Sequence, residues 1–208
     1  MPRHARSPEM AAVDSDQSVA ALLARAIPAT AQAIAALAAI AHRRSYNAGE
    51  YLLSGGERAE WVFLIAKGLI RELYVGEGGG EHNRSFAAEG QFTGSLRDLM
   101  TLGPSVSWIQ ALEPTDVVAW PWARFDRLCD VHPTLERAAR RMTEALYVSK
   151  VQREHAMLAL SATERYARWL SEHGAFDRRI SRRHLASYLG MTPEHLSRLR
   201  ARRIRPVR

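Results

Sequence analysis

The residues whose types and spacing could do chemistry lie near the C-terminus, where Glu194, Ser197 and Arg198 fall on one side of an expected helix. Residues three and four positions apart share a helix face. On such a face a glutamate can accept from the cytosine amino group, and an arginine can bind guanine through two hydrogen bonds. This set therefore predicts base reading in the major groove of duplex DNA.

Cations and a hydroxyl around this stretch predict contacts with the DNA backbone. Arginine side chains and helix N-termini are common phosphate ligands because they offer N–H donors and positive charge. The predicted phosphate contacts are Arg182, Arg183, Thr192, Arg200, Arg202 and Arg203. The competing interpretation is a solvated, charged face on a helical hairpin.

The elements that position these residues form a helix-turn-helix pattern. Ser181 is a favourable N-cap, and the helix that it starts ends at Gly190, where the turn requires left-handed geometry. Thr192 caps the next helix. Ala186 and Leu196 stand at the positions where two crossing helices bury a small and an apolar side chain. The spacing predicts a recognition helix that carries the base-reading set.

The charge distribution agrees with a nucleic-acid partner. Residues 159–208 contain twelve arginines and four acids, whereas residues 1–158 contain seventeen basic and eighteen acidic residues. The whole net charge of +7 thus lies in the last quarter of the chain. Such asymmetry is expected of a DNA-binding unit joined to a neutral one, although a basic tail that contacts acidic protein or membrane has the same signature.

A long helix is expected immediately before this unit. Neither Gly nor Pro interrupts residues 134–157, and a heptad-like stripe runs along them. A stripe of this length predicts a helix that pairs with its copy in a homodimer; the alternative is packing on its own chain. The predicted dimer positions are Leu135, Ala138, Met142, Ala145, Ser149 and Gln152.

The first part of the chain predicts a β-rich domain. Short apolar runs between glycines fill residues 46–120, which is typical of a jelly roll, sandwich or small barrel. Residues 18–43 predict two short helices that are broken at Pro28. The fold class is therefore α+β. We expect a mobile arm (1–18), a sensor domain (19–132), a dimerisation helix (133–157) and a helix-turn-helix domain (158–208).

Other features bear on the compartment. No apolar run reaches the roughly 18 residues that a membrane span requires. Acids occupy the place of a signal peptide's apolar core, and Cys129 is the single cysteine, so it cannot form an internal disulfide. These features predict a cytoplasmic protein without a membrane association.

From about Gly49 onward the chain resembles the Crp/Fnr family of bacterial regulators. The match rests on the stretch 90–96, similar to the family's G-x-F-x-G-E-L motif, on Phe125 to Pro133 before the long helix, on the helix-turn-helix 181–200, and on 194–198, similar to an E-x-x-S-R pattern. The resemblance implies a homodimeric transcription regulator with a cyclic-nucleotide-binding-like sensor domain. It also implies a pseudo-palindromic operator with half-sites roughly 34 Å apart, and contact with RNA polymerase if the regulator is an activator.

The sequence departs from the family where cyclic AMP would bind. The possible ligand pocket comprises Gly94, Ser95, Leu96, Ser105, Val106 and Lys150. Here Ser95 replaces the glutamate that holds ribose, and Ser105-Val106 replaces the Arg-Ser pair that holds the phosphate. A buried phosphate without its cation is costly. We therefore expect no response to cyclic AMP through the usual pocket, predict no cofactor, and leave the effector open.

Three alternatives remain at this point. The chain could be a sensor that binds a cyclic nucleotide or another small molecule, or a haem sensor with His82 as ligand. A cupin-like metalloenzyme would use His82-Asn83-Arg84 and Glu89, but an arginine cannot be a neutral metal ligand. The residues after Ile204 predict a truncated or absent wing beyond the recognition helix.

Overall fold

A computed structural model describes residues 18–204 of the chain, with the side chains of residues 18–201. The expected mobile arm lies outside the described residues except for Ser18, and so do residues 205–208, on which the expectation of a truncated wing depends. The elements in chain order are α1 (Val19–Ala26), α2 (Ala31–Ala39), β1 (His42–Tyr46), β2 (Tyr51–Leu53), β3 (Trp61–Lys67), β4 (Leu69–Val75), β5 (Glu81–Ala88), β6 (Phe92–Thr93), α3 (Leu96–Thr101), β7 (Trp108–Ala111), β8 (Thr115–Pro121), α4 (Trp122–Val131), α5 (Pro133–Ala159), α6 (Ala162–His173), η1 (Gly174–Phe176), α7 (Arg182–Leu189) and α8 (Pro193–Ile204).

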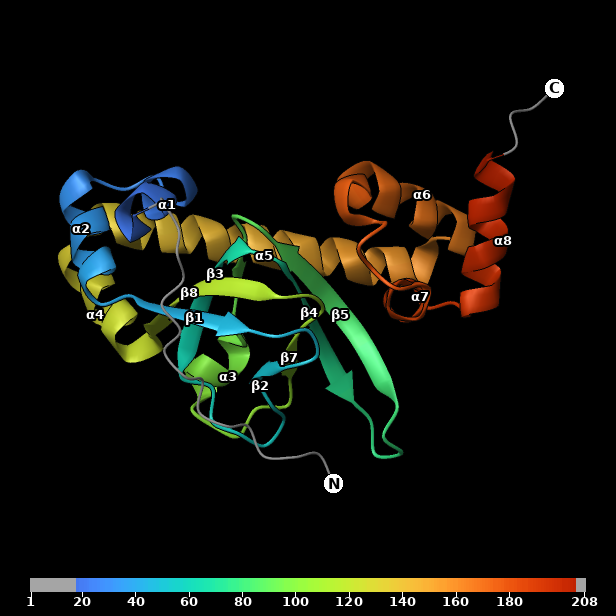
Figure 1. Cartoon of the computed structure of the whole chain (residues 1–208), viewed down its shortest axis with the longest axis horizontal. Coiled ribbons are helices and arrows are strands. Elements are labelled where there is room, and N and C mark those ends of the chain that lie inside the picture. The colour runs from blue at the N-terminus through green and yellow to red at the C-terminus, as the bar shows by residue number, and fades with distance from the viewer. Residues whose placement is uncertain (1–17, 205–208) are drawn as a thin grey trace.

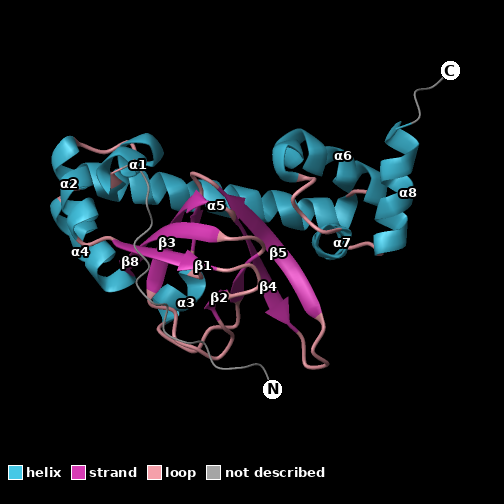
Figure 2. Ribbon diagram, in the orientation of Figure 1, coloured by secondary structure: helices cyan, strands magenta, loops and turns pink. Residues whose placement is uncertain are grey.

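The β strands form two packed four-stranded sheets, which we call the sandwich (Figure 2). One sheet has the order β1-β8-β3-β6 and the other β2-β7-β4-β5, with antiparallel pairing throughout. Because alternate side chains of a strand point to opposite faces, each sheet buries one set of apolar residues between the sheets. The predicted jelly-roll domain is confirmed.

Two short helices and α4 cover the outer face of the β1-β8-β3-β6 sheet. The side chains of Ser18 and Thr30 accept hydrogen bonds from the first turns of α1 and α2, so each helix begins at its own N-cap. Trp120 of β8 points outward and donates from Nε1 to the carbonyl of Leu37 in α2 at 2.9 Å. The predicted pair of helices on either side of Pro28 is confirmed.

Helix α5 runs along the molecule from the N-terminal helices to the C-terminal ones (Figure 1). It spans 27 residues, with Pro133 in the first turn, where a proline lacks no hydrogen bond that the helix needs. A capping box between Ser161 and Glu164 then starts α6 in a new direction. None of the described helices has the length and apolar content that crossing a bilayer requires.

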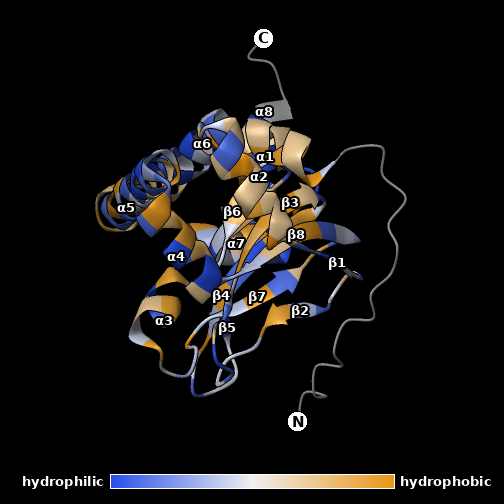
Figure 3. Ribbon diagram, turned by 90° about the vertical axis from the view of Figure 1, so that its left-hand side faces the viewer, coloured by the Kyte–Doolittle hydropathy of each residue, from blue (hydrophilic) through white to orange (hydrophobic). Residues whose placement is uncertain are grey.

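The predicted dimer stripe is wrong at its first two positions. Leu135 and Ala138 are 1% and 2% exposed, because they pack into the core that α1, α2 and α4 share with the sandwich. Met142 is half-buried, while Ala145, Ser149 and Gln152 are exposed. The large exposed apolar residues of α5 lie at other positions, namely Leu146, Tyr147, Val148, Val151, Met157 and Leu158. Viewed end-on, α5 lies at the edge of the molecule with polar and apolar residues around it (Figure 3).

Helices α6, α7 and α8 form a compact C-terminal group. Their buried residues include Trp169, Leu185, Leu189 and Leu196, and they share one apolar core with residues of β4 and β5. The C-terminal helices therefore pack directly on the outer face of the β2-β7-β4-β5 sheet, beside β5 in Figure 1.

Candidate nucleic-acid interface

Helix α7 is fixed at both ends by the residues that the sequence indicated. Ser181 Oγ accepts from the backbone N–H of His184 at 3.2 Å, and the helix ends at Gly190, whose φ is +63°. A Cβ at Gly190 would lie 2.5 Å from Cε of Met157 on α5. Glycine is therefore required at this turn for its backbone conformation and for the close approach of α5.

Helix α8 follows after a turn of three residues. Thr192 Oγ1 accepts from the backbone N–H of His195 at 3.2 Å, so this hydroxyl caps the recognition helix. Leu196 and Leu199 of α8 are buried against Leu185 and Ala186 of α7. The arrangement is the predicted helix-turn-helix. The predicted phosphate contact at Thr192 competes with the use of the hydroxyl as a cap.

The predicted base readers lie together on one exposed surface, which we call the reading face. Glu194 and Arg198 are exposed and Ser197 is half-buried. With the starts of α7 and α8 they line a shallow groove, which comprises Ser181, Arg182, Arg183, Pro193, Glu194, Ser197 and Arg198. Arg182 Nη1 lies 3.4 Å from Oγ of Ser197, so the groove is bridged from α7 to α8.

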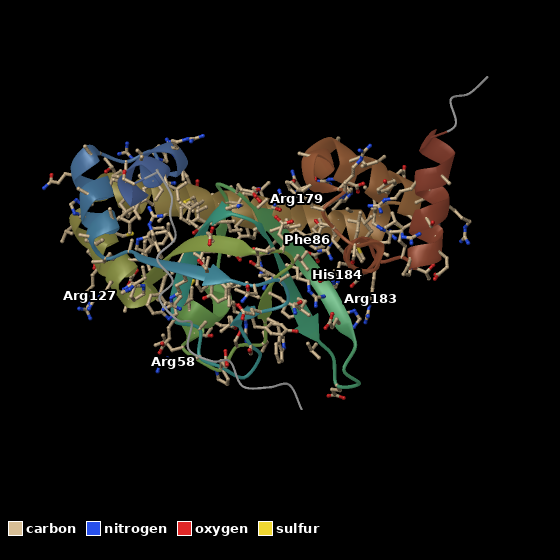
Figure 4. The ribbon with its side chains drawn as sticks, in the orientation of Figure 1. Arg58, Phe86, Arg127, Arg179, Arg183 and His184 are labelled. Carbon is tan, nitrogen blue, oxygen red and sulfur yellow. The ribbon has the colours of Figure 1, made fainter. Side chains whose placement is uncertain are left out.

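The reading face offers both charged acceptors and charged donors. A hydrogen bond from its own backbone N–H, then the Thr192 hydroxyl and the nearby Arg198, lowers the pKa of Glu194. The carboxylate is therefore ionised at neutral pH and is available as an acceptor for a cytosine amino group. Arg182, Arg183 and Arg198 are exposed cations, and in Figure 4 Arg183 points away from the body of the molecule.

The predicted phosphate contact at Arg200 competes with bonds inside the C-terminal group. Arg200 donates to the backbone carbonyl and to Oδ1 of Asp177 at 3.3 and 3.1 Å, and it lies 3.4 Å from the hydroxyl of Tyr166. Its side chain is 24% exposed. The guanidinium is thus engaged in joining α8 to the segment before α7. The side chains of Arg202 and Arg203 lie outside the described residues.

The predicted ligand pocket contains a carboxylate that the sequence analysis did not identify. Asp98 of α3 is 0% exposed. It accepts from Ser95 Oγ at 2.7 Å and Ser105 Oγ at 2.6 Å, while Arg97 donates at 2.6 Å from the surface. Burial alone would raise the pKa of Asp98, but these hydrogen bonds outweigh it and lower the pKa. The two serines of the pocket therefore bind an anion of their own chain.

The remaining pocket residues differ in their surroundings. Gly94 has a φ of +157°, and a Cβ there would lie 3.4 Å from the carbonyl oxygen of Trp61. Leu96 is half-buried at the start of α3. Val106 is 51% exposed, so its side chain does not line an enclosed pocket. Lys150 lies on α5, where burial and then the neighbouring charge of Arg84 lower its pKa.

An ion pair that was not predicted from the sequence lies beside Lys150. Glu72 of β4 accepts from Thr93 Oγ1 at 2.6 Å, and its other carboxylate oxygen is 3.3 Å from Nη2 of Arg84 in β5. Arg84 also donates to Ser107 Oγ at 3.1 Å. The register between β4 and β5 shifts here, because Glu72 pairs with Ser85 and Leu73 with Asn83, which leaves Arg84 as the extra residue of β5. The only sequence signal was a pair of charges within an otherwise apolar strand.

The residues proposed as ligands in the metal and haem alternatives do not come together among the described residues. His82 is exposed on β5, Arg84 pairs with Glu72, and Glu89 accepts from Arg179 at 2.8 Å, so the cupin-like set does not converge. Within residues 18–201, no three His, Cys, Asp or Glu side chains are grouped so that they could hold a metal ion.

Comparisons with known proteins identify the relatives of this chain. Residues 43–132 match the family model of the cyclic nucleotide-binding domain. The fumarate nitrate reduction regulatory protein of Klebsiella oxytoca is 26% identical over 174 residues, which cover 78% of this chain and 69% of the relative. FixK2 of Bradyrhizobium japonicum is 24% identical, with a TM-score of 0.69 over 78% of this chain and 84% of FixK2.

A further solved relative is the regulator CLP of Xanthomonas campestris, which is described as c-di-GMP responsive. It is 18% identical, with a TM-score of 0.63 over 83% of this chain and 91% of CLP. At these identities the two solved structures establish the fold: a cyclic nucleotide-binding-like sandwich, a long helix and C-terminal helices.

Proposed function

We propose that this chain is a transcription regulator of the Crp/Fnr type, which binds duplex DNA in a sequence-specific manner as a homodimer. The observation that carries the proposal is the reading face. Glu194, Ser197 and Arg198 lie on one exposed surface of α8, and the exposed cations Arg182 and Arg183 flank them at the start of α7. A recognition helix placed in the major groove presents this combination to base edges and phosphates.

Glu194 and Arg198 have complementary roles on this face. An ionised Glu194 accepts from a cytosine amino group, and Arg198 donates to a guanine in the same groove. Arg182 and Arg183 bind phosphates and fix the register of the helix on the duplex. Thr192 contributes as the N-cap of α8, because its hydroxyl fixes the start of the helix that carries the base-reading residues.

Dimerisation through α5 is the second part of the proposal. Tyr147, Val148, Val151 and Leu158 are exposed apolar residues on a helix that is otherwise rich in charge. A partner helix that covers them removes apolar surface from water, which contributes roughly 25 cal/mol per Å². A twofold dimer then reads a pseudo-palindrome with half-sites about one helical turn apart.

The sensor part is proposed to work without the usual cyclic-nucleotide chemistry. Asp98 already accepts the hydrogen bonds of the Ser95 and Ser105 hydroxyls, so a ligand phosphate at these serines would lie beside a carboxylate. Like charges in a buried site repel strongly. A different small-molecule effector remains the alternative, as does a sensor that binds a cyclic nucleotide without DNA. We also propose a cytoplasmic, non-catalytic protein, with RNA polymerase as a further partner if it activates transcription.

The direct experiment is selection of duplexes from a randomised library, followed by anisotropy titration of the selected and a scrambled duplex at several salt concentrations. We expect tighter binding of the selected duplex and an affinity that falls with salt, because phosphate contacts release counterions. Equal affinity for both duplexes, independent of salt, would rule out DNA reading. Calorimetry with cyclic AMP and cyclic GMP tests the sensor part separately, and saturable binding there would contradict it.

A further inference from the structure

The outer face of strands β4 and β5 completes the core of the C-terminal helices. Leu69, Phe86 and Ala88 of these strands are buried in one cluster with α6, α7 and α8. The ring of Phe86 lies 5.7 Å from that of Trp169 and 5.4 Å from that of Tyr188, with tilted geometries that aromatic pairs prefer. Figure 4 shows Phe86 on the side of β5 that meets these helices.

A buried cluster of polar side chains, which we call the node, lies beside this apolar contact. It comprises Arg71, Glu81, Asn83 and His184. Arg71 of β4 is 3% exposed. Its Nη1 donates to Glu81 at 2.7 Å and to Asn83 at 3.2 Å, and it lies 3.0 Å from Nδ1 of His184 on α7. An arginine has only donors, so Nδ1 of His184 is the acceptor and the imidazole is neutral. Burial, and then the charge of Arg71, lowers the pKa of His184 to about 4, in agreement with this state.

Asn83 of β5 provides the second attachment to α7. Its Nδ2 donates to the backbone carbonyl of His184 at 3.0 Å, and its backbone N–H donates to Ser187 Oγ at 3.1 Å. Ser187 in turn donates to the carbonyl of Glu81 at 3.2 Å. Because residues 184 and 187 lie one turn apart, these bonds hold one face of α7 along the strand.

Arg153 of α5 closes the contact from the other side. It donates to the carbonyl of Tyr188 at 2.8 Å and to that of Asn83 at 3.2 Å, and its guanidinium lies 4.0 Å from the centre of the Tyr188 ring. The first helix of the helix-turn-helix is therefore bonded to β4, β5 and α5 at once. Its other faces carry the core residues and the exposed Arg182 and Arg183.

We infer that Arg71 and Asn83 of the sandwich are positioning residues for DNA reading: they fix α7, and through it α8, at one place on the sensor domain. The inference rests on the proposed function, because it concerns how far apart a dimer holds its two recognition helices. Helix α8 follows α7 rigidly, since Leu185 and Leu196 share a core and Arg182 reaches Ser197. Without the node, the reading face is no longer held in one orientation on the sensor domain, although the residues of the reading face are unchanged.

The test compares Arg71→Lys and His184→Leu with wild type. Lysine keeps the charge but cannot place donors on Gln110, Glu81 and His184 together, and leucine removes the acceptor at residue 184. His184→Gln is the rescue variant, because an amide oxygen can accept from Arg71. Arg140→Lys is the matched control, because Arg140 pairs with Glu144 on the exposed side of α5.

Two measurements are made on the full chain. Hydrogen exchange without DNA follows the amides of α7, and anisotropy follows binding to selected duplexes whose half-site spacing is varied one base pair at a time. For Arg71→Lys and His184→Leu we expect α7 exchange about tenfold faster, because a buried charge-assisted bond is lost. We also expect these two variants to bind duplexes of different half-site spacing with more nearly equal affinity. Their preference for particular bases within a half-site should stay as in wild type. His184→Gln and Arg140→Lys keep the wild-type pattern.

Exchange of α7 and a spacing profile equal to wild type in both node variants would overturn the inference. If Arg71→Lys does not fold, His184→Leu and His184→Gln decide it, because they alter only the helix side of the node. If wild type selects no duplex, the proposed function fails. The exchange measurement then still shows whether the contact between Arg71 and His184 holds α7.

Discussion

Ser105 donates a 2.6 Å hydrogen bond from Oγ to Oδ2 of Asp98, a carboxylate that is fully buried in the sandwich domain. Ser95 donates to the same oxygen at 2.7 Å. The chain thus provides, from a residue of α3, the negative charge that this pair of hydroxyls binds. Stability and ligand response of the sandwich should both depend on this one carboxylate.

We expect Asp98→Asn to destabilise the sandwich. The amide replaces an ionised acceptor of three side-chain hydrogen bonds with a neutral group that cannot satisfy all of them, which costs about 1–3 kcal/mol. Urea unfolding at pH 7 measures the change. Asp126→Asn is the control, since Asp126 is exposed on α4, and it should shift stability by no more than about 0.5 kcal/mol. Equal effects of the two substitutions would show that the pocket bonds contribute nothing.

The difference between wild type and Asp98→Asn should depend on pH. The pKa of Asp98 is lowered in the folded chain, because the bonds from Ser105, Ser95 and Arg97 outweigh burial. A lowered pKa stabilises the fold above the unfolded value of about 3.9 and ceases to do so as pH falls through the folded pKa. Urea unfolding at a series of pH values should therefore show the gap closing below about pH 4. A gap that stays constant down to pH 3 would contradict this.

Arg198→Ala should change which base is preferred, whereas Arg183→Ala should weaken binding to every duplex. Loss of a bidentate base contact costs about 1–3 kcal/mol at one position, while loss of a phosphate contact lowers the salt slope by about one. Anisotropy titrations against single-base variants of the selected duplex distinguish the two. Arg127→Ala on α4, far from the reading face in Figure 4, should leave both quantities unchanged.

Gly190→Ala should destabilise the helix-turn-helix. An L-residue at φ +63° costs roughly 1–2 kcal/mol, and the added Cβ would also displace the end of the Met157 side chain. Gly78→Ala in the β4–β5 hairpin is the matched control, because a Cβ there meets nothing within 4 Å. Thermal unfolding monitored by far-UV circular dichroism compares them. A loss at Gly78 as large as at Gly190 would show that the turn geometry is not the cause.

Val151→Glu should shift the chain from dimer to monomer. The substitution places a charge among the exposed apolar residues of α5, where a partner helix would have to desolvate it. Sedimentation velocity at several concentrations gives the dissociation constant. Met100→Glu is the control, since Met100 is also an exposed apolar residue but lies on α3. A monomeric wild-type chain, or equal weakening by both substitutions, would reject the α5 interface.

Local signals explain which parts of the fold could be predicted. The caps at Ser181 and Thr192 and the glycine at position 190 act within one turn of the chain, so the helix-turn-helix could be placed from the sequence. The alternation of short apolar runs with glycines likewise indicated the sandwich. These features need no partner from elsewhere in the chain.

The missed features depend on partners that are distant in the sequence. Arg71 and Glu72 are consecutive, and since successive strand residues face opposite sides, Arg71 meets α7 while Glu72 faces Thr93 inside the sandwich. No local pattern reveals that His184 lies beside Arg71, 113 residues away in sequence.

The first two positions of the predicted dimer stripe were wrong for a related reason. Helical spacing alone cannot show that Leu135 and Ala138 pack on helices of their own chain.

The core that β4 and β5 share with α6, α7 and α8 bears on how regulators of this kind can be recombined. A chimera that joined residues 160–204 to another sensor would cut Leu69, Phe86 and Ala88 away from Trp169 and its neighbours. The transplanted helices would expose apolar surface unless the host sheet offered side chains of the same shape at the same places. The unit that can be exchanged is therefore larger than the helix-turn-helix, and it includes a two-stranded piece of the sensor.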